Sequence, residues 1–114
     1  MNSNNPIINV LIVDDSAVVR GLISKMISND PNVAVVDTVA NGLLAVKRVD
    51  KGDVDVVVLD IEMPVMDGLT ALPQILAKDP KIKVIIASTL TMKNAEISLR
   101  ALQAGAADYI TKPS

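Results

Sequence analysis

Two short aliphatic runs, each ending in an acidic residue, constrain the fold of this chain more than any other feature. Residues 10–13 (Val-Leu-Ile-Val) are followed by Asp14 and Asp15, and residues 56–59 (Val-Val-Val-Leu) are followed by Asp60. Strands that are buried on both faces, as in parallel sheets, read as such continuous aliphatic runs. Ligands of open parallel sheets bind outside the carboxyl ends of the strands. The sequence therefore predicts a parallel sheet in which these carboxylates converge on one crevice.

Strand and helix patterns alternate along the whole chain, which predicts repeated β-α-β units. The strand patterns cover residues 9–14, 33–39, 54–59, 82–87 and 107–110. The helical patterns begin after a cap at Ser16 or Asp15, at Gly42, after Asp67, and at Met92, where Ala95, Leu99 and Leu102 continue the apolar pattern. Pro73 lies inside the third helical pattern and is expected to weaken or kink that helix, because proline lacks the N–H of the helical hydrogen bond. The order predicts an α/β domain.

The length of 114 residues is sufficient for one domain with a substantial core. We expect this domain to cover residues 1–114, with residues 1–6 as a polar lead-in. After the fifth strand pattern the chain ends at Ser114, where a sheet with helices on both faces would normally continue into a further helix. We therefore expect an uncovered strip of sheet, and self-association through that strip, because exposed apolar patches tend to bind partners.

The absence of two residue types excludes several classes of chemistry. The chain contains no cysteine and no histidine, which removes disulfides, thiolate metal sites, common zinc sites, and Ser/His or Cys/His catalytic groups. The formal net charge of −2 argues against nucleic-acid binding, which requires a clustered basic face. No apolar run approaches the ~20 residues that span a bilayer, and the amino terminus has no signal-peptide pattern. We expect a cytoplasmic protein without a nucleic-acid or membrane partner.

The acidic residues predict a site for a cation and a phosphoryl group. Carboxylates that lie close together repel one another, and a divalent cation relieves that repulsion. Ligands that are all oxygen favour Mg²⁺, with Mn²⁺ as an alternative, over zinc. With one such cation and Lys112, the formal charge of the site is close to zero. A carboxylate can act as a nucleophile toward phosphorus, and Asp60 is the best candidate because it stands alone after a buried strand. Ser88, at the end of the fourth strand, could donate its hydroxyl to a phosphoryl oxygen.

In order and spacing, these residues resemble the receiver domain of two-component response regulators. The resemblance extends from about residue 8 to residue 113 and includes the pair Asp14-Asp15, Asp60 followed by Met63-Pro64-x-x-Asp67-Gly68, Ser88, and Gly105-Ala106-x-Asp108-Tyr109-x-x-Lys112-Pro113. It implies a flavodoxin-like, doubly wound five-stranded sheet in the order 2-1-3-4-5, here without the fifth helix that is usual in the family.

The resemblance also implies an acceptor and a metal site. Asp60 would be the phosphoacceptor in a Mg²⁺-dependent reaction. The metal would be bound by the side chains of Asp15 and Asp60, by the backbone carbonyl of Glu62, and mainly through water by Asp14. The phosphoryl donor would be a histidine kinase, which supplies the phosphohistidine that this chain lacks.

A further set of matching residues would respond to the phosphoryl group. Lys112 would contact it directly, with a cis peptide bond to Pro113. Ser88 and Tyr109 correspond to the family's switch pair, in which the hydroxyl moves toward the phosphate and the ring turns inward. Threonine is more usual than serine at the position of Ser88.

Within the family, two segments resemble the receiver of the chemotaxis protein-glutamate methylesterase. They are Ser88-Thr89-Leu90-Thr91 and Lys93-x-x-Glu96-x-x-Leu99-x-Ala101-Leu102. The chain contains no G-x-S-x-G motif and no histidine, so we expect a regulatory domain rather than an enzyme. Any methylesterase would belong to a C-terminal effector domain outside this chain, and the kinase would be of the chemotaxis type.

Two other functions remain open from the residues alone. A metal-dependent phosphohydrolase of similar topology would usually carry Asp-x-Asp on the first strand, a pattern that Asp14-Asp15-Ser16 does not match. A docking module with the receiver fold would act without phosphate, and it would keep its output after the substitution Asp60→Asn.

Overall fold

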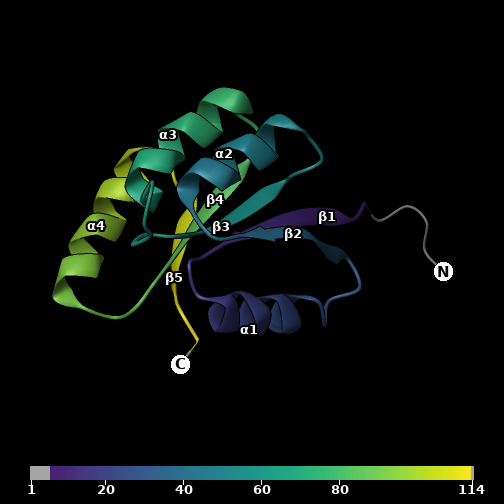
Figure 1. Ribbon diagram of the computed structural model, residues 1–114, viewed down its shortest axis with the longest axis horizontal. Helices are drawn as coiled ribbons and strands as arrows, with labels where there is room; N and C mark the ends of the chain where they lie inside the picture. The colour runs from purple at the N-terminus through teal and green to yellow at the C-terminus, as the bar shows by residue number, and fades with distance from the viewer. Residues whose placement is uncertain (1–5, 114) are drawn as a thin grey trace.

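The computed structural model describes residues 6–113, which form a parallel sheet with helices on both faces (Figure 1). The strands are β1 (Ile8–Val13), β2 (Val33–Val39), β3 (Val56–Asp60), β4 (Lys83–Ser88) and β5 (Asp108–Thr111). The helices are α1 (Ala17–Ile27), α2 (Gly42–Asp50), α3 (Gly68–Lys78) and α4 (Met92–Gln103). Neighbouring strands pair in parallel in the order β2-β1-β3-β4-β5. The predicted alternation of elements and the flavodoxin-like strand order are therefore confirmed.

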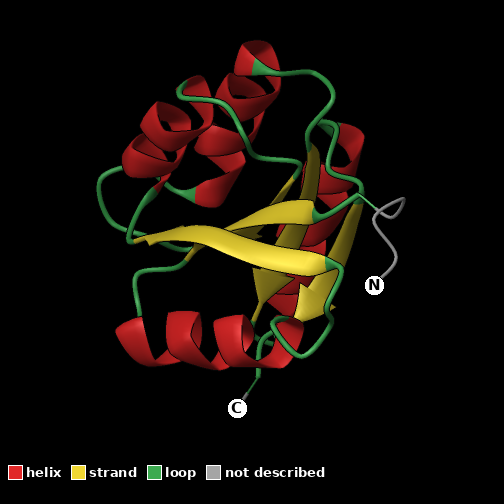
Figure 2. Ribbon diagram, turned by 90° about the vertical axis from the view of Figure 1, so that its right-hand side faces the viewer, coloured by secondary structure: helices red, strands yellow, loops and turns green. Residues whose placement is uncertain are grey.

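The helices are divided unequally between the two faces of the sheet. Figure 1 shows α2 and α3 above the sheet and α1 below it, and in Figure 2 α1 again forms a layer of its own. The larger core lies between the sheet and α2, α3 and α4, and Leu59, Leu72 and Ile86 are fully buried there. The smaller core lies between the sheet and α1, around Ile12 and Ile23. Because both faces of β1 and β3 are covered, these strands consist almost entirely of aliphatic residues.

A side-chain cap precedes the first residue of each described helix. Side-chain oxygens of Ser16, Asn41, Asp67 and Thr91 each accept a hydrogen bond from the backbone N–H three residues later. Such a cap typically contributes about 1 kcal/mol to stability. Of the two caps that the sequence allows for the first helix, Ser16 is confirmed and Asp15 is wrong.

The described helices are short. None of them is long and apolar enough to cross a membrane. α3 continues through Pro73 to its end at Lys78, so the proline does not end the helix.

Helix α4 buries polar as well as apolar side chains. Its buried residues are Asn94, Ser98 and Ala101. Met92 and Leu99, two of the apolar residues that mark this helix in the sequence, are 91% and 59% exposed. Met92 and Leu99 therefore lie outside the contact of α4 with the core, whereas Ile97 and Leu102 pack against it.

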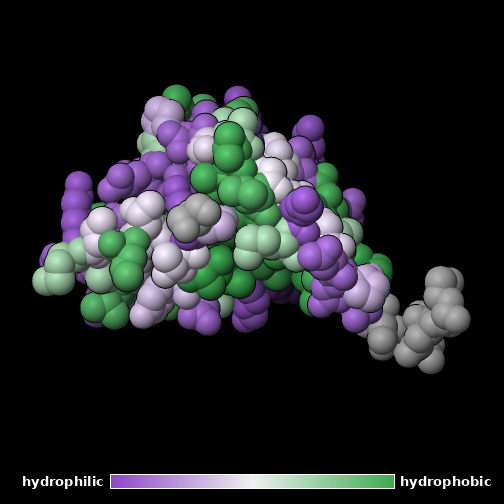
Figure 3. All heavy atoms as spheres, turned by 90° about the horizontal axis from the view of Figure 1, so that it is seen from below, coloured by the Kyte–Doolittle hydropathy of each residue, from purple (hydrophilic) through white to green (hydrophobic). Residues whose placement is uncertain are grey.

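Apolar side chains remain exposed on the α1 side of the molecule. Val18, Leu22 and Met26, spaced four residues apart along α1, are all exposed, and so are all four residues of β5. Figure 3 views the molecule from this side and shows hydrophobic surface at its centre. Self-association through these exposed residues stays a prediction.

Candidate functional site

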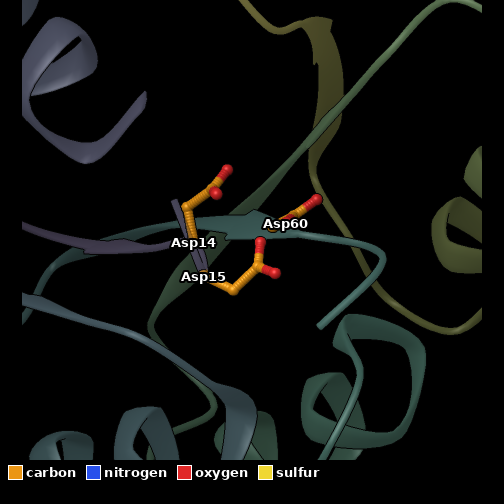
Figure 4. Close-up of side chains that lie close together, drawn as sticks. All are labelled: Asp14, Asp15 and Asp60. Atoms are coloured by element: carbon orange, nitrogen blue, oxygen red, sulfur yellow. The ribbon is translucent and has the colours of Figure 1, made fainter. Parts of the chain in front are cut away.

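Three carboxylates meet at one edge of the sheet. Asp14 and Asp15 directly follow β1, and Asp60 is the last residue of β3, which pairs with β1 in parallel. One carboxylate oxygen from each residue lies within 4.8 Å of the others (Figure 4). The carboxyl ends of the two strands thus bring together the acidic residues that the sequence singles out.

Lys112 lies between the two buried carboxylates of this cluster. Its Nζ is 2.9 Å from Oδ2 of Asp14 and 2.8 Å from Oδ1 of Asp60. Asp14 and Asp60 are almost fully buried, whereas Asp15 is exposed. The backbone N–H of Lys112 donates to the carbonyl of Ser88 at 2.9 Å, which fixes the lysine at this edge of the sheet.

The burial of Asp60 changes its acidity. Burial raises the pKa of Asp60 from 3.8 to about 6; the hydrogen bond from Lys112 opposes this shift, and the negative charge of Asp14 adds to it. Burial lowers the pKa of Lys112, but hydrogen bonds and charges of Asp60 and Asp14 outweigh burial, so the pKa of Lys112 is raised. Lys112 is therefore protonated at neutral pH. The surroundings of Asp60 stabilise its ionised form less than water does.

Ser88 and Tyr109 lie on the two strands beyond β3. Ser88 ends β4 and is buried, one residue after Ala87, which pairs with Asp60. Tyr109 is on β5, pairs with Ile86, and is 51% exposed. Ser88 is therefore at the edge of the carboxylate cluster, whereas Tyr109 lies farther back along the sheet and its ring is half in solvent.

The loop that follows Asp60 is held by close backbone contacts. The N–H of Glu62 points to Oδ1 of Asp60 at 3.4 Å. The N–H of Gly68 donates to the carbonyl of Ile61 at 2.9 Å, and a Cβ on Gly68 would lie 2.1 Å from the carbonyl oxygen of Asp60. A side chain at this position would displace the backbone of Asp60, so glycine is required there.

Three residues that support the site were not recognised in the sequence. Nη1 of Arg20 donates to the carbonyl of Asp14 at 2.7 Å. The N–H of Gly42 donates to the carbonyl of Met66 at 3.0 Å, which ties the start of α2 to the loop after β3. Val65, in the same loop, has φ of 71°, a left-handed conformation that β-branched residues rarely adopt. The contact between Gly42 and Met66 joins segments that are distant in the sequence, so no local sequence pattern signals it.

One expectation from the family resemblance is wrong. No peptide bond between residues 6 and 113 is cis, so the bond between Lys112 and Pro113 is trans.

The donor atoms at the cluster fit a hard divalent cation. Oδ2 of Asp60 is buried and accepts no hydrogen bond from any described residue. A buried carboxylate oxygen without a partner is costly, and a cation beside Asp14, Asp15 and Asp60 would compensate it. Because all available ligands are oxygen atoms, the site suits Mg²⁺ better than zinc.

A parallel sheet in this order, with a carboxylate cluster and a bridging lysine at one edge, defines the receiver domains of two-component signalling. A family model described as the response regulator receiver domain matches residues 10–114. The chain belongs to this family, and the resemblance found in the sequence is confirmed.

The relatives in sequence carry the names of two enzyme activities. A protein-glutamate methylesterase/protein-glutamine glutaminase of a group 2 operon in Rhodospirillum centenum is 60% identical over 92% of this chain and 27% of its own length. A protein with the same activities in its name, from Rhodospirillum rubrum, is 59% identical over 94% of this chain and 28% of its own length. The chain thus spans about a quarter of the length of these relatives.

Solved structures similar to this chain include receiver domains of chemotaxis proteins. The response regulator domain of Thermotoga maritima CheB is 43% identical, has a TM-score of 0.86, and matches over 94% of this chain and 79% of that chain. A structure of the P1 domain of CheA3 in complex with CheY6 from R. sphaeroides matches with a TM-score of 0.78 and 37% identity, over 96% of this chain and 84% of that chain. The predicted likeness to the methylesterase receiver is therefore confirmed.

Proposed function

We propose that the chain is a phosphorylation-controlled regulatory domain in which Asp60 accepts a phosphoryl group from the phosphohistidine of a separate histidine kinase. The observation that carries this proposal is the environment of Asp60. Its carboxylate is buried, lies 2.8 Å from Nζ of Lys112, and shares a cluster with Asp14 and Asp15. This arrangement supplies a nucleophile, a fixed cation, and ligands for a second cation, which are the parts that phosphoryl transfer requires.

In the proposed reaction, an oxygen of Asp60 attacks the phosphorus of the donor. The P–N bond of the phosphohistidine breaks while the P–O bond forms, and the electron pair leaves with the imidazole. Lys112 exchanges its contact with Asp60 for a phosphoryl oxygen and keeps its contact with Asp14. The hydroxyl of Ser88 donates to another phosphoryl oxygen.

Mg²⁺, with Mn²⁺ as a substitute, would be held by Asp14, Asp15, Asp60 and the backbone carbonyl of Glu62. When bound, the metal neutralises charge on the phosphoryl oxygens. Asp15 is the exposed member of the cluster, so it is the residue through which a hydrated ion would enter and leave.

The phosphoryl group would bias the chain between two conformations. The exposed ring of Tyr109 would turn inward when Ser88 moves toward the phosphate. A difference of a few kcal/mol between the two states is enough for a usable switch.

The similarity to methylesterases and to the CheA3–CheY6 complex supports a place in chemotaxis. The kinase would be of the chemotaxis type, and the output would be a C-terminal effector domain outside this chain. Residues 1–114 would form one regulatory, non-enzymatic domain that acts in the cytoplasm without a nucleic-acid or membrane partner. Any methylesterase activity would reside in the effector domain.

The test is the intact mass of the protein after incubation with acetyl phosphate, with and without Mg²⁺. We expect one labile phosphoryl group that requires Mg²⁺, that is lost in Asp60→Asn, and that is retained in Asp50→Asn, whose carboxylate is exposed on α2. Labelling of Asp60→Asn at the wild-type level would reject Asp60 as the acceptor. Turnover of a phosphate ester without a lasting adduct would favour a phosphohydrolase. Unchanged partner binding in Asp60→Asn would favour a phosphate-independent docking module.

A further inference from the structure

A groove lies beside the acidic cluster, between the segment after β3 and helix α4. Its volume is about 410 Å³, within the range of pockets that bind ligands. Asp14, Asp15 and Asp60 do not line it. The groove is therefore separate from the proposed phosphorylation site, although both involve the loop that follows Asp60.

The floor of the groove is apolar. Ile61 is buried, and Met63, Leu69 and Ile97 are partly buried against the larger core. The floor of the groove is thus the part of the larger core whose apolar surface is in contact with water. An apolar side chain placed there would remove hydrophobic surface from water, at about 25 cal/mol for each Å² buried.

Charges of opposite sign line the two walls. Lys93 and Arg100 line the α4 wall, seven residues apart with Ile97 between them, whereas Glu62 and Asp67 line the opposite wall. At a helical rise of 1.5 Å per residue, the backbone positions of Lys93 and Arg100 are about 10 Å apart along α4. Among the described residues, none of these four side chains is in an ion pair. Both cations are therefore available to an external ligand.

We propose that the groove binds a peptide segment of a protein partner, with an apolar side chain on the floor and two carboxylates against Lys93 and Arg100. This spacing of the two backbone positions suits two separate carboxylates better than one small anion. In a polyproline II peptide, which has three residues per turn, carboxylates three residues apart lie on the same face of the chain and about 9 Å apart, at about 3.1 Å per residue. The acidic wall repels the same carboxylates, so it orients the segment along α4.

The groove is physically linked to Asp60. Its residue Glu62 donates its backbone N–H toward Oδ1 of Asp60, and Ile61 and Met63 flank Glu62. A peptide that fixes this loop therefore alters the surroundings of Asp60, and by linkage a change at Asp60 alters peptide affinity. This coupling, unlike binding itself, rests on the proposed phosphorylation of Asp60.

Binding is tested with fluorescein-labelled peptides by fluorescence anisotropy, on the unphosphorylated chain in EDTA. The probe is Glu-Leu-Ile-Glu flanked by Gly and Ser, beside a helical peptide with carboxylates seven residues apart. Control peptides replace both Glu by Gln, or both apolar residues by Ser. We expect saturable binding of at least one acidic, apolar probe and much weaker binding of its controls.

The site is tested with a matched pair of double variants. Lys93→Gln with Arg100→Gln removes two charges from the groove, and Lys25→Gln with Lys51→Gln removes two charges elsewhere. Two exposed charge contacts at up to about 1 kcal/mol each predict a roughly tenfold loss of affinity in the first variant. The second variant has the same net charge, so its affinity should stay close to that of the wild type.

Three results would overturn the proposal. They are the absence of saturable binding by both probes, an equal loss of affinity in both double variants, and dimerisation of the chain that depends on Lys93 and Arg100. Addition of acetyl phosphate and Mg²⁺ then tests the coupling, which predicts a change in peptide affinity that is absent in Asp60→Asn. If no phosphoryl adduct forms, the proposed function fails, while the binding measured in EDTA still decides the groove.

Discussion

Replacement of Asp60 by asparagine should stabilise the folded chain when no divalent cation is present. Asp60 is 2% exposed, and burial raises its pKa from 3.8 to about 6. When the pKa of an acid is higher in the folded state than in the unfolded state, the folded state holds the proton more tightly. The folded state therefore loses stability as the pH rises from the unfolded pKa to the folded pKa. At about 1.4 kcal/mol per pH unit between the two values, ionised Asp60 costs the fold about 3 kcal/mol above pH 7.

Asparagine removes the buried charge but also the ion pair with Lys112. Because Lys112 keeps its 2.9 Å contact with Asp14, its own charge stays compensated. We therefore expect Asp60→Asn to raise the free energy of unfolding at pH 8 by about 1–3 kcal/mol. The gain should shrink as pH falls through about 6 and be small near pH 4, where Asp60 is protonated in the wild type.

Urea unfolding in EDTA, followed by circular dichroism at pH 8 and pH 4, measures this difference. Asp50→Asn is the control, because its exposed pair with Lys78 should change stability by no more than about 1 kcal/mol. Addition of Mg²⁺ should stabilise the wild type more than Asp60→Asn. A loss of stability in Asp60→Asn at pH 8 would show that the ion pair with Lys112 stabilises the fold by more than the burial of the charge costs.

Three further predictions concern a buried hydroxyl, a left-handed backbone conformation and exposed apolar side chains. Ser98→Ala should raise the midpoint of urea unfolding, because the buried Ser98 hydroxyl has no hydrogen-bond partner among the described residues. An unpaired buried group costs about 1–3 kcal/mol. A lowered midpoint would show that the hydroxyl does have a partner. Val65→Asn should stabilise by about 1 kcal/mol, since asparagine tolerates the left-handed conformation, and Val65→Thr should give no such gain. The exposed α1 residues Val18 and Leu22 predict self-association, which sedimentation velocity measures; a monomer at all concentrations, or a dimer unaffected by Val18→Ser with Leu22→Ser, would contradict it.

The sequence predicted the meeting of the carboxylates because the rule behind it is topological. Asp14 and Asp60 each follow a buried aliphatic run, and parallel strands place their carboxyl ends at one edge whatever the details of packing. The bond between Gly42 and Met66 could not be predicted in this way. It joins the start of one helix to a loop far along the chain, and only the packing of α2 beside α3 brings the two together.

Helix α4 shows a second limit of sequence patterns. Apolar periodicity identifies the helix correctly, but it does not say which residues contact the sheet. Met92 and Leu99 are exposed, while Asn94 and Ser98 are buried. Asn94 is turned inward because its Nδ2 donates to the carbonyl of Thr89 at 3.1 Å and to Oγ1 of Thr89 at 2.9 Å. A specific polar contact therefore turns Asn94 inward on a helix whose Ile97 and Leu102 also pack against the core.

The same contact links α4 to the proposed site. Thr89 directly follows Ser88, so a movement of Ser88 toward a phosphoryl group would also displace the residue to which Asn94 is bonded. Helix α4 buries two side-chain oxygens that lack hydrogen-bond partners, on Asn94 and Ser98. Unpaired buried oxygens cost free energy, so α4 is held in its position less firmly than it would be by apolar side chains. An element that is weakly held in place needs little free energy to move. We infer that α4 is the element whose position phosphorylation of Asp60 would change most readily.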